Sequence, residues 1–388
     1  MAELTDNNQK KIIAFYLPQY HAIPENDKWW GKGFTEWTNT RKALPIFEGH
    51  YQPKIPLNES YYDLSDITVM EKQSILAQKY DVYGFCYYHY WFKNGKKLLE
   101  KPIEQMLDDP KVNIPFMLCW ANENWTRNWD GGNSEVIAKQ EYGKEKDWKI
   151  HLEYLLQFFR DDRYIKYQGK PLLAIYKPEQ IILFNEMISY WRKAMKKAGF
   201  PDIIILRQHP GKIMKQQDYS IKFQPPAAWA QWNTDGYYKT DSVKTRIKSI
   251  VKKTMVRLGR EELMQQLIVK RFAESRQKKT PIRLYDYDEC WRSILDDEVF
   301  NDKMCSGGFT AWDNTPRSRH GIIVHGSTPQ KFETYMAELL RKPSAMNLVF
   351  VNAWNEWGEG AYLEPDEKYG YAYLEALKNA LNSMYSEL

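Results

Sequence analysis

The chain has 388 residues, enough for one large domain or for two. Its 55 basic and 50 acidic residues leave a formal net charge of +5, which is small for this length, so the overall charge gives no reason to expect nucleic acid as a partner. No apolar run is long enough to span a bilayer, and residues 1 to 11 lack the apolar region of a signal peptide. We therefore expect a protein that is not transmembrane and that resides in the cytoplasm.

Eight short runs of β-branched or aromatic residues alternate with helical stretches, a pattern typical of βα units around a parallel sheet. In chain order the predicted strands are Ile12 to Leu17, Tyr83 to Tyr88, Pro115 to Ala121, Pro171 to Tyr176, Ile203 to Gln208, Ser220 to Gln224, Gly308 to Trp312 and Leu348 to Ala353. The predicted helices include Ile67 to Lys79, Lys144 to Phe159, Glu186 to Ala198, Pro329 to Arg341 and Tyr371 to Ser386. The count predicts an α/β fold, a single (β/α)8 TIM barrel over residues 1–388.

Strands six and seven are separated by far more chain than one helix needs. Residues 241–280 carry 12 Lys/Arg and 4 Asp/Glu in a helical pattern, which predicts an inserted basic helical segment at about 241–290. Such a segment is either a solvated helix face or a surface for peripheral contact with an anionic polymer or a lipid-linked glycan.

Cysteines and aromatic residues restrict the class of protein further. The four cysteines, Cys86, Cys119, Cys290 and Cys305, form neither a CxxC nor a zinc pattern, so we expect reduced thiols rather than disulfides. Aromatic residues make up 15% of the chain, with 15 Trp and 27 Tyr. They form either an aromatic-rich core or platforms for sugar rings.

The active site of a barrel of this kind lies at the C-terminal ends of its strands. The residues that follow strands one, two, three, seven and eight are rich in aromatic, amide and carboxylate side chains, which suit a polyhydroxylated ring better than a phosphate. A carbohydrate substrate is therefore expected. The candidate substrate-binding residues chosen on this ground are Gln19, His21, His89, Trp91, Trp120, Asn122, Glu123, Trp125, Trp312, Asp313, Asn355 and Trp357.

Two carboxylates follow strand eight, Glu356 and Glu359, with Trp354 and Trp357 beside them. Cleavage of a glycosidic bond needs one group that protonates the leaving oxygen and a second carboxylate that assists the displacement. We interpret this pair as catalytic; the alternative is that both are acidic residues at the start of the next helix. Glu123 is a third candidate, unless it only pairs with Arg127. The histidines lack metal-ligand spacing, so neither a metal nor another cofactor is expected.

The segment from Asn355 to Gly360, followed by Leu363-Glu364-Pro365, resembles the signature of glycoside hydrolase family 99. Along most of its length the chain is similar to the WbsX-type proteins of bacterial surface-polysaccharide loci, which are related to that family. The stretches that carry this resemblance are residues 15–21, 29–37, 84–91, 120–125 and 312–315. They add Tyr16, Trp30, Glu36, Trp37 and Tyr88 to the expected substrate-binding residues, and the signature segment after strand eight adds Glu364.

The resemblance implies a retaining mechanism without an enzyme-linked sugar. Glu356 would be the base that deprotonates the substrate's own 2-hydroxyl, and Glu359 the acid that protonates the leaving group. The 2-hydroxyl must then lie trans to the leaving oxygen, as in α-mannosides and α-rhamnosides. Gly358 stands where family 99 hydrolases typically carry His, so mannose itself is not implied.

Two other functions remain open. The WbsX-type name carries a glycosyltransferase label, and Asp286-Tyr287-Asp288 has the Asp-x-Asp form that holds a metal and a sugar nucleotide in many transferases. The nucleotide-binding βαβ context of such a fold is missing, which favours hydrolysis or transglycosylation. A non-catalytic carbohydrate-binding protein would keep the aromatic loops but would not need paired acids.

Overall fold

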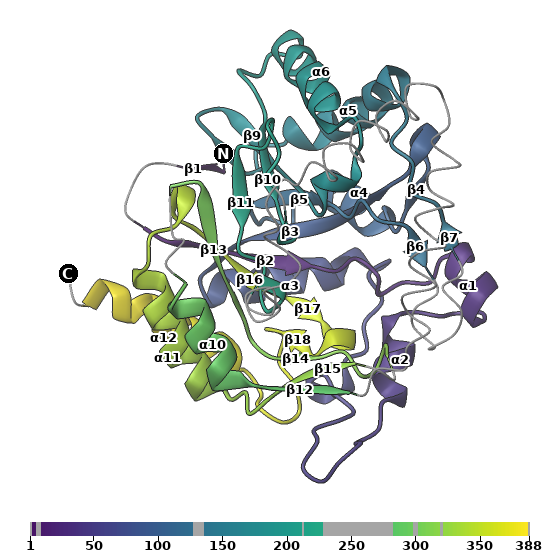
Figure 1. Cartoon of the computed structure of the whole chain (residues 1–388). Helices are drawn as coiled ribbons and strands as arrows, with labels where there is room; N and C mark the ends of the chain where they lie inside the picture. Colours follow the sequence, from purple (N-terminus) through teal and green to yellow (C-terminus); the bar gives the residue numbers. More distant parts are fainter. Residues whose placement is uncertain are drawn as a thin grey trace, which may run out of the picture.

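The computed structural model describes residues 2–4, 9–126, 136–211, 213–227, 282–297, 302–318 and 321–386. Eight parallel strands form a closed barrel at its centre (Figure 1). They are β2 (Lys11–Tyr16), β3 (Val82–Trp91), β5 (Phe116–Trp120), β9 (Lys170–Ile175), β10 (Ile204–Arg207), β11 (Tyr219–Ile221), β13 (Met304–Phe309) and β16 (Leu348–Asn352). Each strand pairs with the next in this order, and β16 pairs with β2, so the sheet closes. The predicted (β/α)8 barrel is confirmed.

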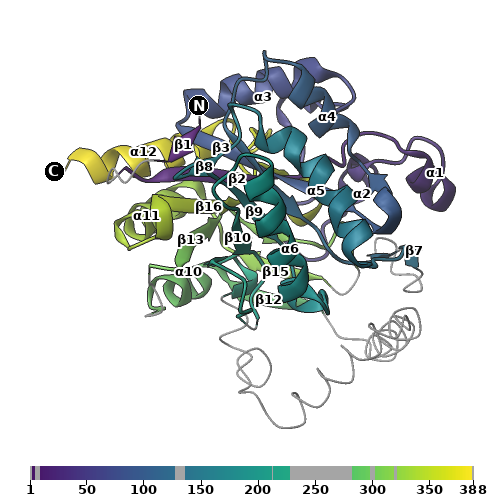
Figure 2. The ribbon, with the colours of Figure 1, turned by 90° about the horizontal axis from the view of Figure 1, so that it is seen from above.

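Helices surround the barrel on its outside (Figure 2). They are α3 (Ile67–Lys79), α4 (Lys101–Asp108), α5 (Glu145–Phe159), α6 (Phe184–Lys197), α10 (Tyr287–Leu295), α11 (Pro329–Arg341) and α12 (Ala372–Ser386). Two shorter helices, α1 (Pro24–Trp30) and α2 (Glu36–Lys42), belong to the connection that follows β2. Asp66 and Thr328 cap α3 and α11 by accepting a hydrogen bond from a backbone N–H of the first turn, which fixes where these helices begin.

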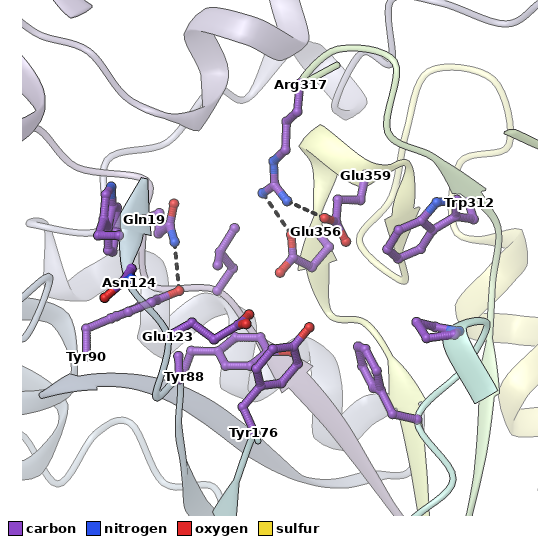
Figure 3. Close-up of a pocket in the computed structure, with 15 residues that line it drawn as sticks. Gln19, Tyr88, Tyr90, Glu123, Asn124, Tyr176, Trp312, Arg317, Glu356 and Glu359 are labelled. Carbon is purple, nitrogen blue, oxygen red and sulfur yellow. Dashed lines mark hydrogen bonds and ion pairs between the residues drawn. The ribbon is translucent and has the colours of Figure 1, made fainter. Parts of the chain in front are cut away.

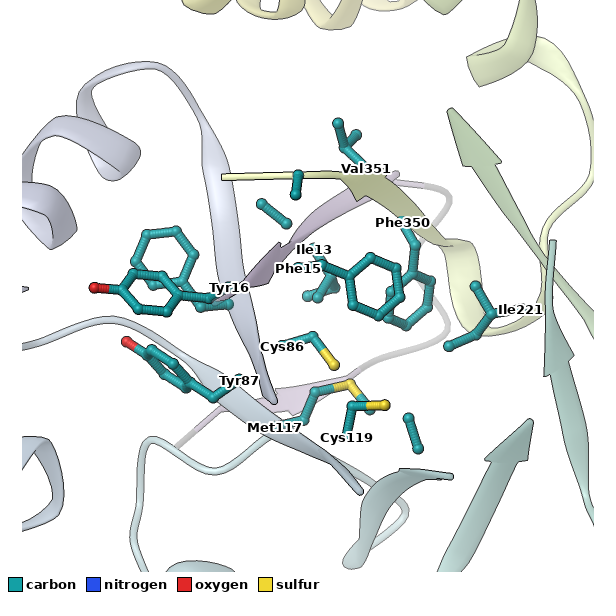
Figure 4. Packing of buried hydrophobic residues seen from close by; sticks show 14 of the residues in the cluster. Ile13, Phe15, Tyr16, Cys86, Tyr87, Met117, Cys119, Ile221, Phe350 and Val351 are labelled. Atoms are coloured by element: carbon teal, nitrogen blue, oxygen red, sulfur yellow. The ribbon is translucent and has the colours of Figure 1, made fainter. Parts of the chain in front are cut away.

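Alternation along the strands divides the core into two layers. Phe15 packs against Phe350 and Phe223 inside the barrel, with ring centroids 5.5 and 5.2 Å apart. Its neighbour Tyr16 points the other way, toward the helices, and its ring lies 4.6 Å from that of Tyr87. Figure 4 shows both sets of side chains. Because successive side chains of a strand point to opposite faces, every second residue faces the barrel interior. All four cysteines are buried and free, as expected.

The seventh barrel strand begins earlier than predicted. Strand β13 covers Met304–Phe309, whereas Trp312 and Asp313 form a separate strand, β14 (Trp312–Asp313). The predicted bounds, Gly308 to Trp312, were wrong because they left out Met304 to Gly307 and added Trp312. Gly307 and Gly308 both lie inside the observed strand, where a Cβ on Gly308 would approach the Met336 sulfur to 2.7 Å and one on Gly307 would overlap the backbone oxygen of Lys222.

The remaining strands are short and lie at the barrel ends or outside it. Strand β14 pairs antiparallel with β15 (Ile322–His325), which pairs in parallel with β12 (Arg283–Asp286). The others are β1 (Glu3–Leu4), β4 (Lys97–Leu98), β6 (Trp125–Thr126), β7 (Val136–Ala138), β8 (Lys166–Tyr167), β17 (Asn355–Glu356) and β18 (Ala361–Tyr362). Short 3-10 helices are η1 (Leu57–Glu59), η2 (Lys93–Gly95), η3 (Pro178–Gln180), η4 (Ala345–Asn347) and η5 (Trp357–Glu359).

The predicted basic segment falls mainly on residues 228–281, which lie outside the described residues. Of the range 241–290, the structure describes β12 and the beginning of α10. None of the helices in the described ranges combines the length and the apolar character that crossing a bilayer requires.

Candidate active site

A pocket of about 390 Å³ opens at the C-terminal ends of the barrel strands, and its size is that of a small-molecule site (Figure 3). Residues from the segments after β2, β5, β9, β11, β13 and β16 line it, together with residues of β3. The lining residues are Leu17, Gln19, Tyr88, Tyr90, Ala121, Glu123, Asn124, Trp125, Tyr176, Phe223, Pro226, Trp312, Arg317, Glu356 and Glu359.

The pair predicted as catalytic meets at one guanidinium group. Arg317 lies between the carboxylates, with Nη2 2.9 Å from Oε2 of Glu356 and Nη1 2.7 Å from Oε1 of Glu359. A third carboxylate, Glu36 of α2, takes the other edge of the same group, 3.1 Å from Nε and 3.0 Å from Nη2. Three carboxylates thus surround one cation, so the cluster carries two net negative charges if all three are ionised.

Burial raises the pKa values of two carboxyl groups in this cluster, Glu356 and Glu36. Glu36 is 0% exposed and Glu356 6%. Burial raises the pKa of Glu356 to about 8; the charge of Arg317 opposes the rise, and those of Glu359 and Glu36 add to it. Burial also raises the pKa of Glu36, again against Arg317. Burial therefore favours the protonated form of Glu356 at neutral pH. This is unexpected, since a raised pKa is the usual mark of a general acid, and the resemblance makes Glu356 the base.

The loop that carries the pair is fixed by hydrogen bonds from several parts of the chain. Asn355 binds both the backbone N–H and the backbone oxygen of Leu17, at 2.7 and 3.1 Å. The Tyr20 hydroxyl donates to the backbone oxygen of Asn355 at 2.6 Å, and the indole N–H of Trp357 donates to Glu364 at 2.7 Å. These contacts hold Glu356 and Glu359 at the mouth of the barrel.

Aromatic and amide side chains form the walls on both sides of the carboxylates (Figure 3). On one side Gln19 donates to the Tyr90 hydroxyl at 2.7 Å, and the Tyr90 ring lies 4.9 Å from that of Trp125. Trp312 lies on the other side. Glu123 borders the pocket and binds the ammonium group of Lys177 at 2.7 Å. Its expected alternative partner, Arg127, lies outside the described residues.

The pocket receives only part of the predicted set: Gln19, Tyr88, Glu123, Trp125, Trp312, Glu356 and Glu359. On β3 the reason is alternation: Tyr88 and Tyr90 face the pocket, whereas His89 and Trp91 face the helices. There His89 contacts His151 at 3.0 Å between the ring nitrogens, and burial lowers the pKa of His89 to about 3. Trp120 is on the same outer side and donates to the backbone oxygen of Trp91.

Other predicted residues lie beneath the pocket or beside it. Tyr16 donates to Gln73, Trp37 donates to the backbone oxygen of Tyr62, and His21 is buried at 2% exposure. Asp313 accepts from Gln52 at 2.6 Å and lies 2.8 Å from a ring nitrogen of His50. Hydrogen bonds or ion pairs to the loops and to the charged cluster are made by Asn122, Asn355, Trp357, Glu364 and Glu36. Trp30 stacks on Phe34. None of these lines the pocket in the described structure.

Several residues of the site escaped the sequence analysis, namely Arg317, Tyr90, Asn124, Tyr176 and Phe223. Tyr90 could have been found from the alternation of β3. Tyr176 directly follows β9, so its position alone was a usable signal. No local sequence signal pointed to Arg317, because its contact with Glu36 joins positions 281 residues apart.

The Asp-x-Asp triplet has a structural role. Asp286 caps α10 by accepting from the backbone N–H of Glu289 at 2.9 Å. Asp288 binds the ammonium group of Lys331 at 2.6 Å and the hydroxyl of Tyr335 at 2.7 Å. Neither residue borders the pocket. Within the described ranges, no group of three His, Cys, Asp or Glu is arranged to hold a metal ion.

A family model matches most of the chain, and curated relatives match it at 35% identity. The family model described as Glycosyltransferase WbsX matches residues 12–377. A relative from Xanthomonas campestris pv. campestris (strain B100), described as uncharacterized protein WxcX, is 35% identical over 382 residues, which make up 95% of this chain and 49% of the relative. Its counterpart in a second strain of that pathovar gives the same values. The chain thus spans about half the length of the curated relatives it matches.

Solved structures share the architecture at low identity. A glycoside hydrolase-like protein aligns with a TM-score of 0.50 and 12% identity, over 97% of this chain and 94% of that one. The GH99 endo-alpha-mannosidase from Bacteroides thetaiotaomicron aligns with a TM-score of 0.49 and 12% identity, over 99% of both chains. At this identity the likeness to the glycoside hydrolase-like protein concerns the fold alone.

Proposed function

The chain belongs to the WbsX glycosyltransferase family, and we propose that it cleaves or transglycosylates glycosidic bonds of a bacterial oligosaccharide or polysaccharide, with Glu356 and Glu359 as its catalytic carboxylates. The observation that carries this proposal is the placement of the two carboxylates. They share one guanidinium group and open together onto a pocket with aromatic walls on both sides. A bond between two sugar rings needs this arrangement, with the acids in the middle and a platform for each ring.

The proposed roles follow the family 99 resemblance. Glu356, as a carboxylate, takes the proton of the substrate's 2-hydroxyl while the 2-oxygen attacks the anomeric carbon and closes a 1,2-anhydro ring. The bond to the leaving oxygen breaks as Glu359 protonates that oxygen. In the second step water, or a hydroxyl of an acceptor sugar, gives its proton to Glu359 and opens the ring, and Glu356 returns its proton to the 2-oxygen. The substrate class is an α-mannoside or α-rhamnoside with a free 2-hydroxyl.

Transfer from a sugar nucleotide is the competing function, and the family's name favours it. A diphosphate leaving group is usually held by a metal or by several cations. The charged groups that line the pocket are three carboxylates and Arg317, and Lys177 sits behind Glu123. The described lining is thus acidic, which favours a neutral sugar over a diphosphate at the reacting centre.

Incubation with α-mannoside and α-rhamnoside oligosaccharides, with and without EDTA, tests the proposal. We expect turnover that EDTA leaves unchanged and that Glu359→Gln lowers by at least about 100-fold, because a general acid contributes that much. Glu153→Gln is the matched control, since Glu153 lies on an exposed face of α5 and is 59% exposed. This variant should react at the parental rate.

Two outcomes would overturn the proposal. The first is activity that requires a sugar nucleotide and a divalent metal. The second is sugar binding without turnover in the parent protein, with the same affinity in the double variant Glu356→Gln/Glu359→Gln, which would identify a binding module.

A further inference from the structure

We infer that Arg317 is the positioning residue of the catalytic pair: anchored by the buried Glu36 in a space that Gly358 leaves open, it holds Glu356 and Glu359 together and stays bound to both while charge moves between them. The inference rests on the proposed function for its kinetic part. Its electrostatic part concerns the substrate-free protein alone.

The anchor is the first step. Glu36 is 0% exposed and begins α2, so it enters the cluster from the connection after β2. It accepts from Nε of Arg317 at 3.1 Å and lies 3.0 Å from Nη2. A buried carboxylate without a cation would be strongly unfavourable, and with one it fixes the plane of the guanidinium group. Glu36 therefore orients Arg317 without entering the pocket itself.

Gly358 provides the space for this ion pair. A Cβ at position 358 would lie 2.5 Å from Oε2 of Glu36 and 2.7 Å from Nε of Arg317, both closer than real Cβ contacts. The φ angle of Gly358 is not of the kind that requires glycine, whereas that of Gly360 is positive, at 61°. Glycine at position 358 is thus explained by the close approach of the Glu36 and Arg317 side chains rather than by its backbone conformation.

The third step concerns charge. In the proposed reaction Glu356 gains a proton as Glu359 loses one, so one negative charge passes from the first carboxylate to the second. Arg317 touches Glu356 through Nη2 and Glu359 through Nη1. The same cation therefore stabilises the charge before and after the transfer without moving, which is the arrangement expected of preorganised electrostatics.

The surroundings of Glu356 set the direction of the expected effects. The charged or titratable groups that face it are Arg317, Glu359, Glu36, Tyr20, Tyr88 and Tyr90. Among these the cation favours the ionised form of Glu356, and the two other glutamates oppose it. Removal of Arg317 should therefore raise the pKa of Glu356, and removal of the charge of Glu36 should lower it.

The test is a carboxyl titration by NMR on substrate-free protein labelled with ¹³C at the glutamate carboxyl groups, with Glu356→Gln used to assign the Glu356 signal. We expect Arg317→Gln to move the Glu356 midpoint up by about one pH unit or more, and Glu36→Gln to move it down. Gly358→Ala, which crowds the ion pair, should move it up. Arg192→Gln is the matched control, because Arg192 also holds two carboxylates, Asp202 and Asp218, and does not line the pocket. It should leave the midpoint unchanged.

A kinetic measurement separates positioning from charge. Arg317→Lys keeps a positive charge but loses the fork that spans two carboxylates. It should keep the Glu356 midpoint close to that of the parent protein, yet lower kcat by at least about tenfold with KM little changed. Full recovery of kcat in Arg317→Lys would overturn the positioning role.

The titration also decides the electrostatic role independently of activity. Midpoints that do not move, or that move in the same direction in Arg317→Gln and Glu36→Gln, would overturn it. If no glycoside is turned over but the midpoints move in opposite directions, the proposed function fails while the charge arrangement stands. Circular dichroism of each variant identifies one that does not fold. If Arg317→Gln does not fold, Gly358→Ala replaces it, and if Glu36→Gln does not fold, Glu359→Gln replaces it, because each should move the Glu356 midpoint in the same direction as the variant it replaces.

Discussion

Replacement of Glu356 by glutamine should stabilise the folded protein, and the gain should grow with pH. Glu356 is buried, and its pKa is raised to about 8 from the ordinary value of 4.5. The folded state therefore binds this proton more tightly than the unfolded state does. The contribution of this proton to the free energy of unfolding is fully present below pH 4.5 and is lost as the pH rises toward 8. Over this range the Glu356 carboxyl ionises in the unfolded chain but stays protonated in the folded protein.

The size of the effect follows from these two pKa values. A shift of one pKa unit corresponds to about 1.4 kcal/mol, so ionisation of the unfolded chain costs about 1 kcal/mol of folding free energy at pH 5 and about 3 kcal/mol at pH 7. Glutamine has nearly the same shape and does not ionise, so the variant is free of this cost. The variant should be more stable than the parent by up to these amounts.

Urea denaturation of both proteins between pH 5 and pH 8 measures the difference. Glu153→Gln, which removes an exposed carboxylate on α5, is the control and should give a small difference that does not depend on pH. A Glu356→Gln variant that is less stable than the parent at pH 7, or whose advantage does not grow with pH, would refute the reasoning.

Three further changes have expected outcomes. Since Glu356 must be ionised to act as a base, kcat/KM measured from initial rates should rise with pH, with a midpoint near 8. A fall of kcat/KM across this range would indicate that Glu356 is the acid and Glu359 the base. Trp125→Ala and Trp312→Ala each remove part of the aromatic wall of the pocket, so each should raise KM by about tenfold or more with a smaller change in kcat. Unchanged KM values in steady-state assays would show that the sugar binds elsewhere. Gly307→Ala should lower the free energy of unfolding by about 1–3 kcal/mol in urea titrations, since its Cβ would overlap the backbone oxygen of Lys222, and a neutral result would contradict the close packing of β11 and β13.

The barrel strands could be predicted because they are buried on both faces and read as short apolar runs. Strand β16, predicted at Leu348 to Ala353, runs from Leu348 to Asn352, and all five of its residues are buried. The first half of β13, Met304 to Gly307, was missed because Gly307 is placed there by close packing against the backbone oxygen of Lys222, a contact between separate segments that no local pattern contains.

The site was harder to predict than the fold. Position after a strand selected Glu356 and Glu359, which both line the pocket, but it could not say which of the neighbouring residues face it. On β3 the candidates His89 and Trp91 point outward, and alternation around Tyr88 would have selected Tyr90 instead. Arg317 depends on a contact with Glu36 across 281 positions, and no local pattern predicts a contact of that range.

The departure at Gly358 has a consequence for substrate specificity. The strand-eight segment is where the chain is most similar to the family 99 signature, and there Gly358 replaces the usual histidine. In this structure Arg317 and Glu36 occupy the space that a side chain at position 358 would need, so a histidine at that position would have to displace this ion pair. The group beside Glu356 and Glu359 is therefore Arg317, which comes from another loop and carries a permanent positive charge. Arg317 lines the pocket, so in the proposed reaction a cation rather than an imidazole would lie beside the sugar, and we expect a substrate specificity that differs from that of family 99 hydrolases.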